Sequence, residues 1–172
     1  MIWTESHRAD RFSRDIADRH YNRQKVGTQQ FVPPGRCLVL KAETPSGRAF
    51  WVTSWPFAEY VKHAWPGAWV CSAFRNEGAW PASSLITQAA QATRAKWPDV
   101  PALGMITFLD RKKVRPTMVR GVPTWGRTWA LAGFKHVGET AGGLMAWQLL
   151  GADMPAPDDS YVAQTNLFGS AA

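Results

Sequence analysis

The residues between positions 74 and 84 have the types and the order expected of a site for a phosphate group. Arg75 lies in a polar segment that ends at Gly78, and Ser83 and Ser84 open an Ala- and Gln-rich run with apolar residues at helical spacing. The unpaired N–H groups of a first helical turn attract anions. These four residues are therefore predicted to bind the phosphate of a cofactor, provided that Glu77 points away or pairs with Arg75. The alternative is an ordinary strand–loop–helix connection with a serine cap.

A second set of residues can move protons. His20 and Tyr21 are adjacent in a polar, arginine-rich segment, and an imidazole beside a phenol can pass protons or, through His20, ligate a metal. Asp110 ends an apolar run, where a carboxylate can polarise an amine or accept its proton, and the cations that follow would keep it ionised. The alternatives are a surface histidine beside a packing tyrosine, and a salt-bridged loop acid.

The charge and the tryptophan content favour a nucleic-acid partner. The chain has 20 Lys and Arg against 13 Asp and Glu, a formal net charge of +7, and 10 Trp among 172 residues. Cations bind the phosphate backbone and exposed aromatic rings stack on bases, although any single Trp more often packs in a core. The predicted contacts to DNA phosphates are Arg19, Arg23, Arg111, Lys112, Lys113 and Arg115.

The elements that must position these residues follow an α+β pattern. Apolar periodicity and turn residues predict helices over 6–23, 57–64, 84–97 and 126–132, and strands over 36–41, 49–54, 69–72, 102–110, 134–138 and 143–150. The first two strands form a hairpin, and residues 111–116 form a basic loop directly after Asp110. We expect one domain over residues 1–151 with a mixed sheet, followed by a flexible tail over 152–172 that is rich in Ala, Pro and Asp.

Cysteine usage and hydropathy favour a cytoplasmic protein. Cys37 and Cys71 both fall in predicted strands, which indicates buried free thiols rather than a disulfide. No apolar stretch approaches the roughly 20 residues that cross a bilayer, and the polar N-terminus does not match a signal peptide.

The order of predicted elements resembles the GCN5-related N-acetyltransferase fold, with its mainly antiparallel sheet flanked by helices. Residues 75–80 resemble that family's Arg-x-x-Gly pyrophosphate loop, with Trp80 at its last position. Residues 129–139 resemble its late Tyr-x-x-x-Gly-Phe signature, with Trp129 in place of the tyrosine. The resemblance implies an acyl-CoA-dependent transferase, with acetyl-CoA or a related donor as cofactor.

A narrower resemblance, over roughly residues 19–150, is to the phage Mom DNA-modification proteins, a divergent branch of that superfamily. Residues 19–23, Arg75, Ser83, Ser84 and Asp110 follow the Mom order and approximate spacing. The resemblance implies a transferase that adds a carbamoylmethyl group to the exocyclic amine of adenine in double-stranded DNA and so hides phage DNA from restriction. It also implies catalytic roles for His20, Tyr21 and Asp110, iron as a further cofactor, and location in the host cytoplasm.

Two other function classes stay open at this point. The chain can be an ordinary N-acetyltransferase acting on a protein, aminoacyl-tRNA or small-molecule amine, or a DNA-binding protein without catalysis on a degenerate acetyltransferase fold. Residues 164–168, Gln-Thr-Asn-Leu-Phe, also resemble the Gln-x-x-Leu-Phe peptide that docks on the bacterial sliding clamp, which makes the host clamp a predicted partner. A chance match is the alternative.

Overall fold

The computed structural model describes residues 1–28, 35–57, 59 and 61–161. Along the chain lie β1 (Thr4–Ser6), α1 (Arg11–Ala17), β2 (Gly35–Thr44), β3 (Gly47–Pro56), β4 (Trp69–Glu77), α2 (Ala82–Lys96), β5 (Met105–Leu109), β6 (Thr117–Val119), β7 (Val122–Thr124), α3 (Arg127–Leu131), β8 (Lys135–Glu139), β9 (Met145–Leu149) and the 3₁₀ turn η2 (Gly151–Asp153). The predicted α+β class is confirmed.

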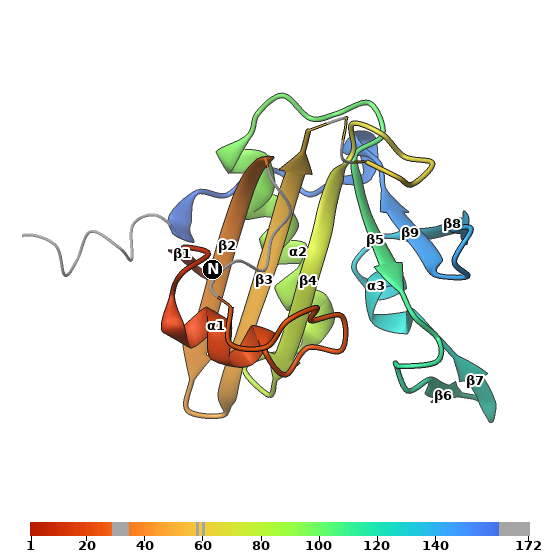
Figure 1. The fold of residues 1–172 in the computed structure, drawn as a ribbon, viewed down its shortest axis with the longest axis horizontal. Helices are drawn as coiled ribbons and strands as arrows, with labels where there is room; N and C mark the ends of the chain where they lie inside the picture. The colour runs from red at the N-terminus through yellow and green to blue at the C-terminus, as the bar shows by residue number, and fades with distance from the viewer. Residues whose placement is uncertain (29–34, 58, 60, 162–172) are drawn as a thin grey trace, which may run out of the picture.

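Seven of these strands form one open sheet in the order β1-β2-β3-β4-β5-β9-β8 (Figure 1). Neighbours are antiparallel except β4 and β5, which are parallel because the α2 crossover joins them. The β2–β3 pairing runs from Gly35 opposite Pro56 to Thr44 opposite Gly47, which confirms the predicted hairpin. β6 and β7 form a separate two-stranded hairpin.

Alternate residues of β2 and β3 are buried on opposite faces of the sheet, as the two-residue period of a strand requires. Leu40 and Trp51 belong to the core that contains Leu85 of α2. Val39 and Phe50 pack in a second core with residues of α1. Figure 1 shows α1 in front of the sheet and α2 behind it. The two helices thus hold the long central strands from both sides.

β4 and β5 are paired over a short distance and then separate. Their register covers three pairs, from Trp69 opposite Met105 to Cys71 opposite Thr107. β4 continues to Glu77 while β3 pairs with its other edge, and β5 ends at Leu109. Beyond Cys71, the edge of β4 that faces β5 must find hydrogen-bond partners outside the β4–β5 pairing. This divergence positions the candidate site.

Three predicted elements have different limits in the structure. The strand predicted over 69–72 continues to Glu77, because β3 pairs with the polar residues that follow. The helix predicted over 6–23 is restricted to Arg11–Ala17, where the Asp10 carboxylate accepts from the Phe12 N–H, and β1 precedes it. The helix predicted over 57–64 is not confirmed: residues 61–64 lie outside any helix, and residues 58 and 60 are not among those described.

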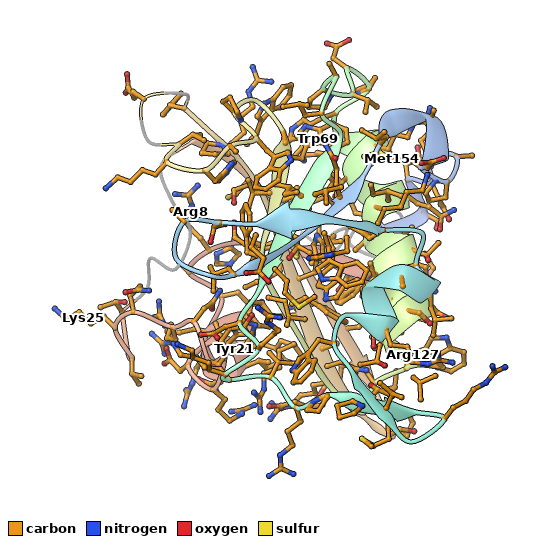
Figure 2. The ribbon with its side chains drawn as sticks, turned by 90° about the vertical axis from the view of Figure 1, so that its right-hand side faces the viewer. Arg8, Tyr21, Lys25, Trp69, Arg127 and Met154 are labelled. Atoms are coloured by element: carbon orange, nitrogen blue, oxygen red, sulfur yellow. The ribbon has the colours of Figure 1, made fainter. Side chains whose placement is uncertain are left out.

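Residues 152–161, which the sequence assigns to the beginning of the flexible tail, include side chains that pack on the domain. Met154 and Tyr161 are buried, and Met154 lies beside α2 (Figure 2). The Arg94 guanidinium on α2 donates to the Met154 and Pro155 carbonyls at 3.2 and 3.1 Å. Part of the predicted tail therefore contacts the domain. The clamp-like peptide at 164–168 lies outside the described residues.

Cys37 and Cys71 are free thiols, as predicted, but only Cys71 is buried, whereas Cys37 is half-buried. Burial raises the pKa of the Cys71 thiol above its ordinary value. None of the helices in the described part of the chain combines the length and the apolarity needed to cross a membrane.

Candidate functional site

Two adjoining cavities lie where β4 and β5 separate. One has a volume of about 310 Å³ and is lined by His20, Arg75 and Trp129, among others. The second has a volume of about 450 Å³ and is lined by Asp110 and His63, among others. Both volumes lie in the range of small-molecule sites. Both cavities are lined by Tyr21, Asn22, Cys71, Ser72, Phe108 and Lys113, so we describe them as one divided site.

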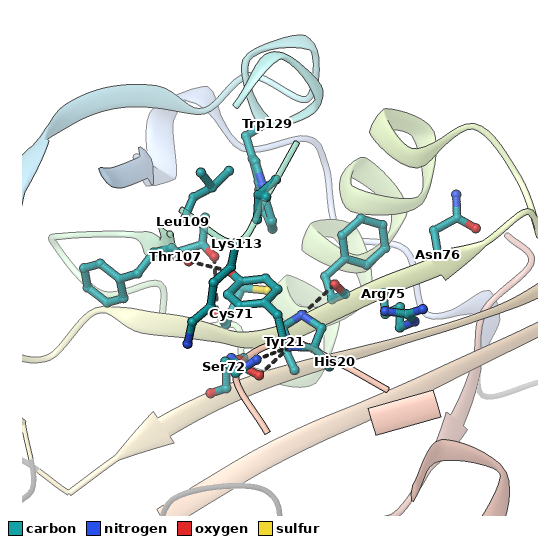
Figure 3. Close-up of a pocket in the computed structure, with 15 residues that line it drawn as sticks. His20, Tyr21, Cys71, Ser72, Arg75, Asn76, Thr107, Leu109, Lys113 and Trp129 are labelled. Carbon is teal, nitrogen blue, oxygen red and sulfur yellow. Dashed lines mark hydrogen bonds between the residues drawn. The ribbon is translucent and has the colours of Figure 1, made fainter. Parts of the chain in front are cut away.

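The segment 20–22 supplies the partners that the separated strands lack. The His20 Nε2–H donates to the Phe74 carbonyl at 3.1 Å, and the Asn22 side-chain amide donates to the Ser72 carbonyl at 2.9 Å, both on β4. The Tyr21 hydroxyl donates to the Phe108 carbonyl on β5 at 3.4 Å. Three consecutive side chains thus bridge the gap and stand at the cavity wall. Figure 3 shows His20 and Tyr21 there, with Trp129 projecting from α3.

His20 is a neutral, fully engaged imidazole near pH 7. Burial lowers its pKa below the ordinary value, and the positive charge of Arg75 acts in the same direction. Nε2 lies 3.1 Å from the Phe74 carbonyl, and Nδ1 contacts both the side-chain oxygen of Asn22 and the Asn22 backbone N–H, which lies 3.3 Å away. Both ring nitrogens are therefore already used by the protein. This geometry supports a positioning role and leaves no nitrogen free to take a substrate proton.

The surroundings of His20 do not fit a metal ion. No group of three or more His, Cys, Asp or Glu in the described residues could hold one. A metal at His20 would also have to displace Asn22 from Nδ1 or the Phe74 carbonyl from Nε2. Iron and the metal role of His20 remain predictions from the resemblance, and no chemical step is assigned to them.

Tyr21 is a protonated hydrogen-bond donor at the junction of the two cavities. Its ring stacks on His20 with the centroids 4.6 Å apart. Burial raises the pKa of the Tyr21 phenol above its ordinary value, so the hydroxyl keeps its proton at neutral pH. The same hydroxyl contacts the backbone of Asp110, which places the two predicted catalytic residues next to each other although they are far apart in the sequence.

Asp110 forms the turn that follows β5. Its carboxylate accepts from the Lys112 backbone N–H at 2.9 Å and lies 3.9 Å from the Lys113 ammonium. Its carbonyl accepts from the N–H groups of Lys113 and Val114, both at 3.0 Å. The carboxylate side chain retains 19% of its exposure and lines the larger cavity. It therefore both shapes the turn and offers an oxygen to a bound molecule.

Aromatic rings line both cavities. Trp129 reaches the smaller cavity and is held by Phe134, with centroids 5.1 Å apart. Phe108 borders both cavities and lies 5.0 Å from the ring of His63. Burial lowers the pKa of His63. The sequence alone did not single out Asn22, His63 or Phe108 for the site. Asn22 could have been noticed as the neighbour of His20 and Tyr21, whereas Phe108 and His63 carry no signal without the topology.

Arg75 lies in β4 instead of a loop, and its guanidinium is part of an ion-pair cluster with Glu77 and Arg19. Its Nε donates to Glu77 at 2.8 Å and one terminal nitrogen donates to the Arg19 carbonyl at 2.7 Å. Arg19 binds the same carboxylate through two nitrogens. The hydrogen bond from Arg19, helped by Arg75, lowers the pKa of Glu77 to about 2. Glu77 thus pairs with Arg75, one of the two arrangements that the phosphate prediction required, and this pairing occupies part of the guanidinium expected to bind phosphate.

The helix-entry loop, residues 78–84, does not join the cavity. Gly78 has φ +89°, and a Cβ there would lie 3.0 Å from the Ser46 carbonyl oxygen, so this glycine accommodates the β2–β3 turn. Ser83 and Ser84 lie in the first turn of α2, behind the N-cap residue Pro81, which makes no side-chain capping bond. The four predicted phosphate ligands are therefore divided: Arg75 borders the cavity, and the other three do not line it.

The predicted DNA contacts differ in how far they are already neutralised. Arg19 pairs with Glu77, Arg23 is buried against Asp18, and Arg111 pairs with Glu139. Within the described residues, Lys112 and Arg115 are exposed and form no ion pair. Lys113 lines the cavity beside Asp110. Arg23 is thus a poor candidate for a phosphate contact, whereas Lys112 and Arg115 are accessible.

In comparisons with known proteins, no family model, no curated protein and no solved structure matches this chain.

Proposed function

We propose that the chain is a DNA-modifying transferase that adds a carbamoylmethyl group to the exocyclic amine of adenine. The observation that carries the proposal is the convergence of Tyr21, positioned by His20, with Asp110 at one divided cavity. These are the residues to which the Mom resemblance gives catalytic roles. Exposed, unpaired cations follow Asp110 in the chain, so a polyanionic substrate can lie across the mouth of the cavity.

Adenine must leave the duplex before its exocyclic amine can react. In a base pair that edge is hydrogen-bonded, so enzymes of this kind extrude the base and stack it against aromatic side chains. Phe108 and Trp129 provide such rings at the cavity, and the Lys113 ammonium provides a hydrogen-bond donor for a ring nitrogen. The divided cavity then accommodates the base on one side and the transferred group on the other.

Asp110 is assigned the proton transfer. The lone pair of the exocyclic nitrogen is delocalised into the ring, which makes the amine a poor nucleophile. As the new N–C bond forms to the methylene carbon of the donor, the bond from that carbon to its carrier breaks and the amine proton passes to the Asp110 carboxylate. The product is an alkyl C–N bond and not an amide, so this step is a displacement at carbon and not an acyl transfer.

Mass spectrometry of nucleosides from cells that express the protein tests the proposal. We expect carbamoylmethylated adenine in DNA from cells with the wild-type chain and none in cells with the empty vector. Unmodified adenine in the presence of abundant, soluble wild-type protein would refute the assignment.

One observation favours the alternative, an acyl-CoA-dependent N-acetyltransferase. The first turn of α2 has no acidic residue and no side-chain cap, so its N–H groups are open to an anion such as a pyrophosphate. Titration with acetyl-CoA distinguishes the two functions. Tight stoichiometric binding of acetyl-CoA together with an absence of DNA affinity would favour the acetyltransferase.

A further inference from the structure

The β6–β7 hairpin, which we call the arm, was not predicted from the sequence and stands apart from the main sheet. Its register pairs Thr117 with Thr124 and Val119 with Val122. Figure 1 shows the arm extending away from the body of the domain, beyond the end of β5. A lone two-stranded hairpin buries little surface and has marginal stability in water. We therefore expect the arm to be stabilised by contact with a binding partner.

Both ends of the arm are fixed at the cavity wall. The chain enters it through Lys113 and Val114, which line the smaller cavity, and leaves it toward Trp129, which lines the same cavity. The Trp125 indole N–H donates to the Val114 carbonyl at 3.0 Å and closes the base of the arm. A displacement of the arm would therefore move residues that border the candidate active site.

The arm exposes apolar side chains at its end. Met118 and Val122 are 60% and 61% exposed. They lie on opposite faces, because Met118 is opposite Pro123 whereas Val122 is opposite Val119. Met118 and Pro123 are exposed on one face of the arm, and Val122 is exposed on the other. The two-residue turn between the strands has φ +49° at Arg120 and +80° at Gly121, which is the left-handed geometry of a tight hairpin.

The charge around the arm identifies the kind of partner. From position 111 to position 138 the sequence contains no Asp or Glu. Seven cations lie in this stretch: Arg111, Lys112, Lys113, Arg115, Arg120, Arg127 and Lys135. This excess of positive charge would not help to bind an apolar protein surface, whereas it attracts a polyanion. Apolar side chains on a cationic β-ribbon fit the stacked bases of duplex DNA, between which Met and Pro act as wedges.

We propose that the arm inserts between base pairs of duplex DNA next to the cavity, with Met118 and Val122 against the bases and Arg120 on a phosphate. This inference rests on the proposed function and adds to it the device that opens the duplex. Insertion at the cavity rim would unstack the neighbouring base, so extrusion of the target adenine would begin at the place where the cavity receives it.

The test combines duplex binding, followed by fluorescence anisotropy, with permanganate oxidation of thymines, which reports unstacked bases. The wild-type chain should make thymines in the bound duplex hyper-reactive. The double variant Met118→Ser, Val122→Ser should lose this reactivity and bind roughly tenfold more weakly. Leu150→Ser, which also replaces an exposed apolar side chain, should behave as the wild type.

A second variant keeps the turn and removes only the charge. Arg120→Asn places a residue that favours left-handed φ before Gly121, so the hairpin is retained. The slope of log affinity against log salt should fall by about 0.9 for one lost phosphate contact. The control Arg11→Gln, which removes an exposed cation from α1, should leave the slope unchanged.

The outcomes separate this inference from the proposed function. A serine double variant that binds and unstacks duplex DNA as the wild type does would overturn the inference, even where adenine is modified. Arm-dependent unstacking without modified adenine would support the inference and count against the transferase assignment.

Discussion

The divided cavity and the helix-entry loop contain similar residue types, yet the structure uses them differently. At the cavity, the side chains of residues 20–22 bind carbonyls that β4 and β5 leave unpaired, and they still border an open volume. In the loop, Gly78 accommodates the Ser46 carbonyl and the Asn76 amide closes on the Trp80 carbonyl at 2.7 Å. Polar residues are thus accessible to a ligand at the cavity, where the pairing of β4 with β5 stops. In the helix-entry loop they stabilise the turn of the backbone instead.

The two regions also differ in how far their cations are neutralised by acidic residues. Next to the loop, Glu77 compensates Arg19 and Arg75 within 3 Å. After Asp110, Lys112 and Arg115 form no ion pair among the described residues. A phosphate backbone therefore gains more by approaching the cavity side. The following predictions test this contrast, beginning with the largest expected effect.

Asp110→Asn should lower the yield of modified adenine about 100-fold or more, because an amide cannot accept the amine proton. The Asn oxygen can still accept from the Lys112 N–H, so the turn should be retained. Nucleoside mass spectrometry and thermal unfolding measure the two effects. The control Asp153→Asn removes an exposed acid that pairs with Lys135, and it should leave the yield unchanged. Equal yields from both variants would remove Asp110 from the site.

Lys112→Gln combined with Arg115→Gln should weaken duplex binding roughly tenfold at moderate salt and reduce the salt slope by about 1.8, which is about 0.9 for each phosphate contact. Arg23→Gln is the informative contrast, because its Nε binds Asp18 at 2.7 Å in a buried position. We expect it to lower the melting temperature and leave the salt slope unaltered. A slope that falls only in Arg23→Gln would reverse the assignment of the DNA-facing side.

Glu77→Gln should lower the free energy of unfolding by about 1 kcal/mol at pH 7, because two guanidinium groups lose their shared carboxylate. The pKa of Glu77 falls from its ordinary 4.5 to about 2 in the folded protein. Its contribution is therefore complete above pH 4.5 and disappears as the pH falls toward 2. Denaturant unfolding of both proteins across this range measures it. A difference between them that stays constant down to pH 2 would contradict the ion-pair account.

Ser83→Ala combined with Ser84→Ala should have the smallest effect. The N-cap position is Pro81, and these serines do not line the cavity, so we expect less than about 0.5 kcal/mol in stability and less than a twofold change in modified adenine. A loss comparable to that of Asp110→Asn would move the site to the helix-entry loop.

Local pattern was sufficient for the hairpin, α2 and the α+β class, because each has strong periodicity and clear turn residues. It misplaced the end of β4, since residues 74–77 look like a polar loop until the pairing of Arg75 with Phe50 of β3 is known. The arm was missed because its strands are short, Pro116 precedes β6, Pro123 lies inside β7, and Arg120-Gly121 is not a typical hairpin turn. The proximity of Tyr21 to Asp110 depends on the topology, which no local pattern contains.

Photocrosslinking of duplex DNA that carries 8-azidoadenine, followed by peptide mapping, tests the central claim most directly, because it locates the extruded base. The account predicts crosslinks to peptides that contain Tyr21, Phe108 or Trp129, reduced when unlabelled duplex competes. Crosslinks concentrated on the peptide with Trp80 and Ser84, or spread without preference over the surface, would contradict it.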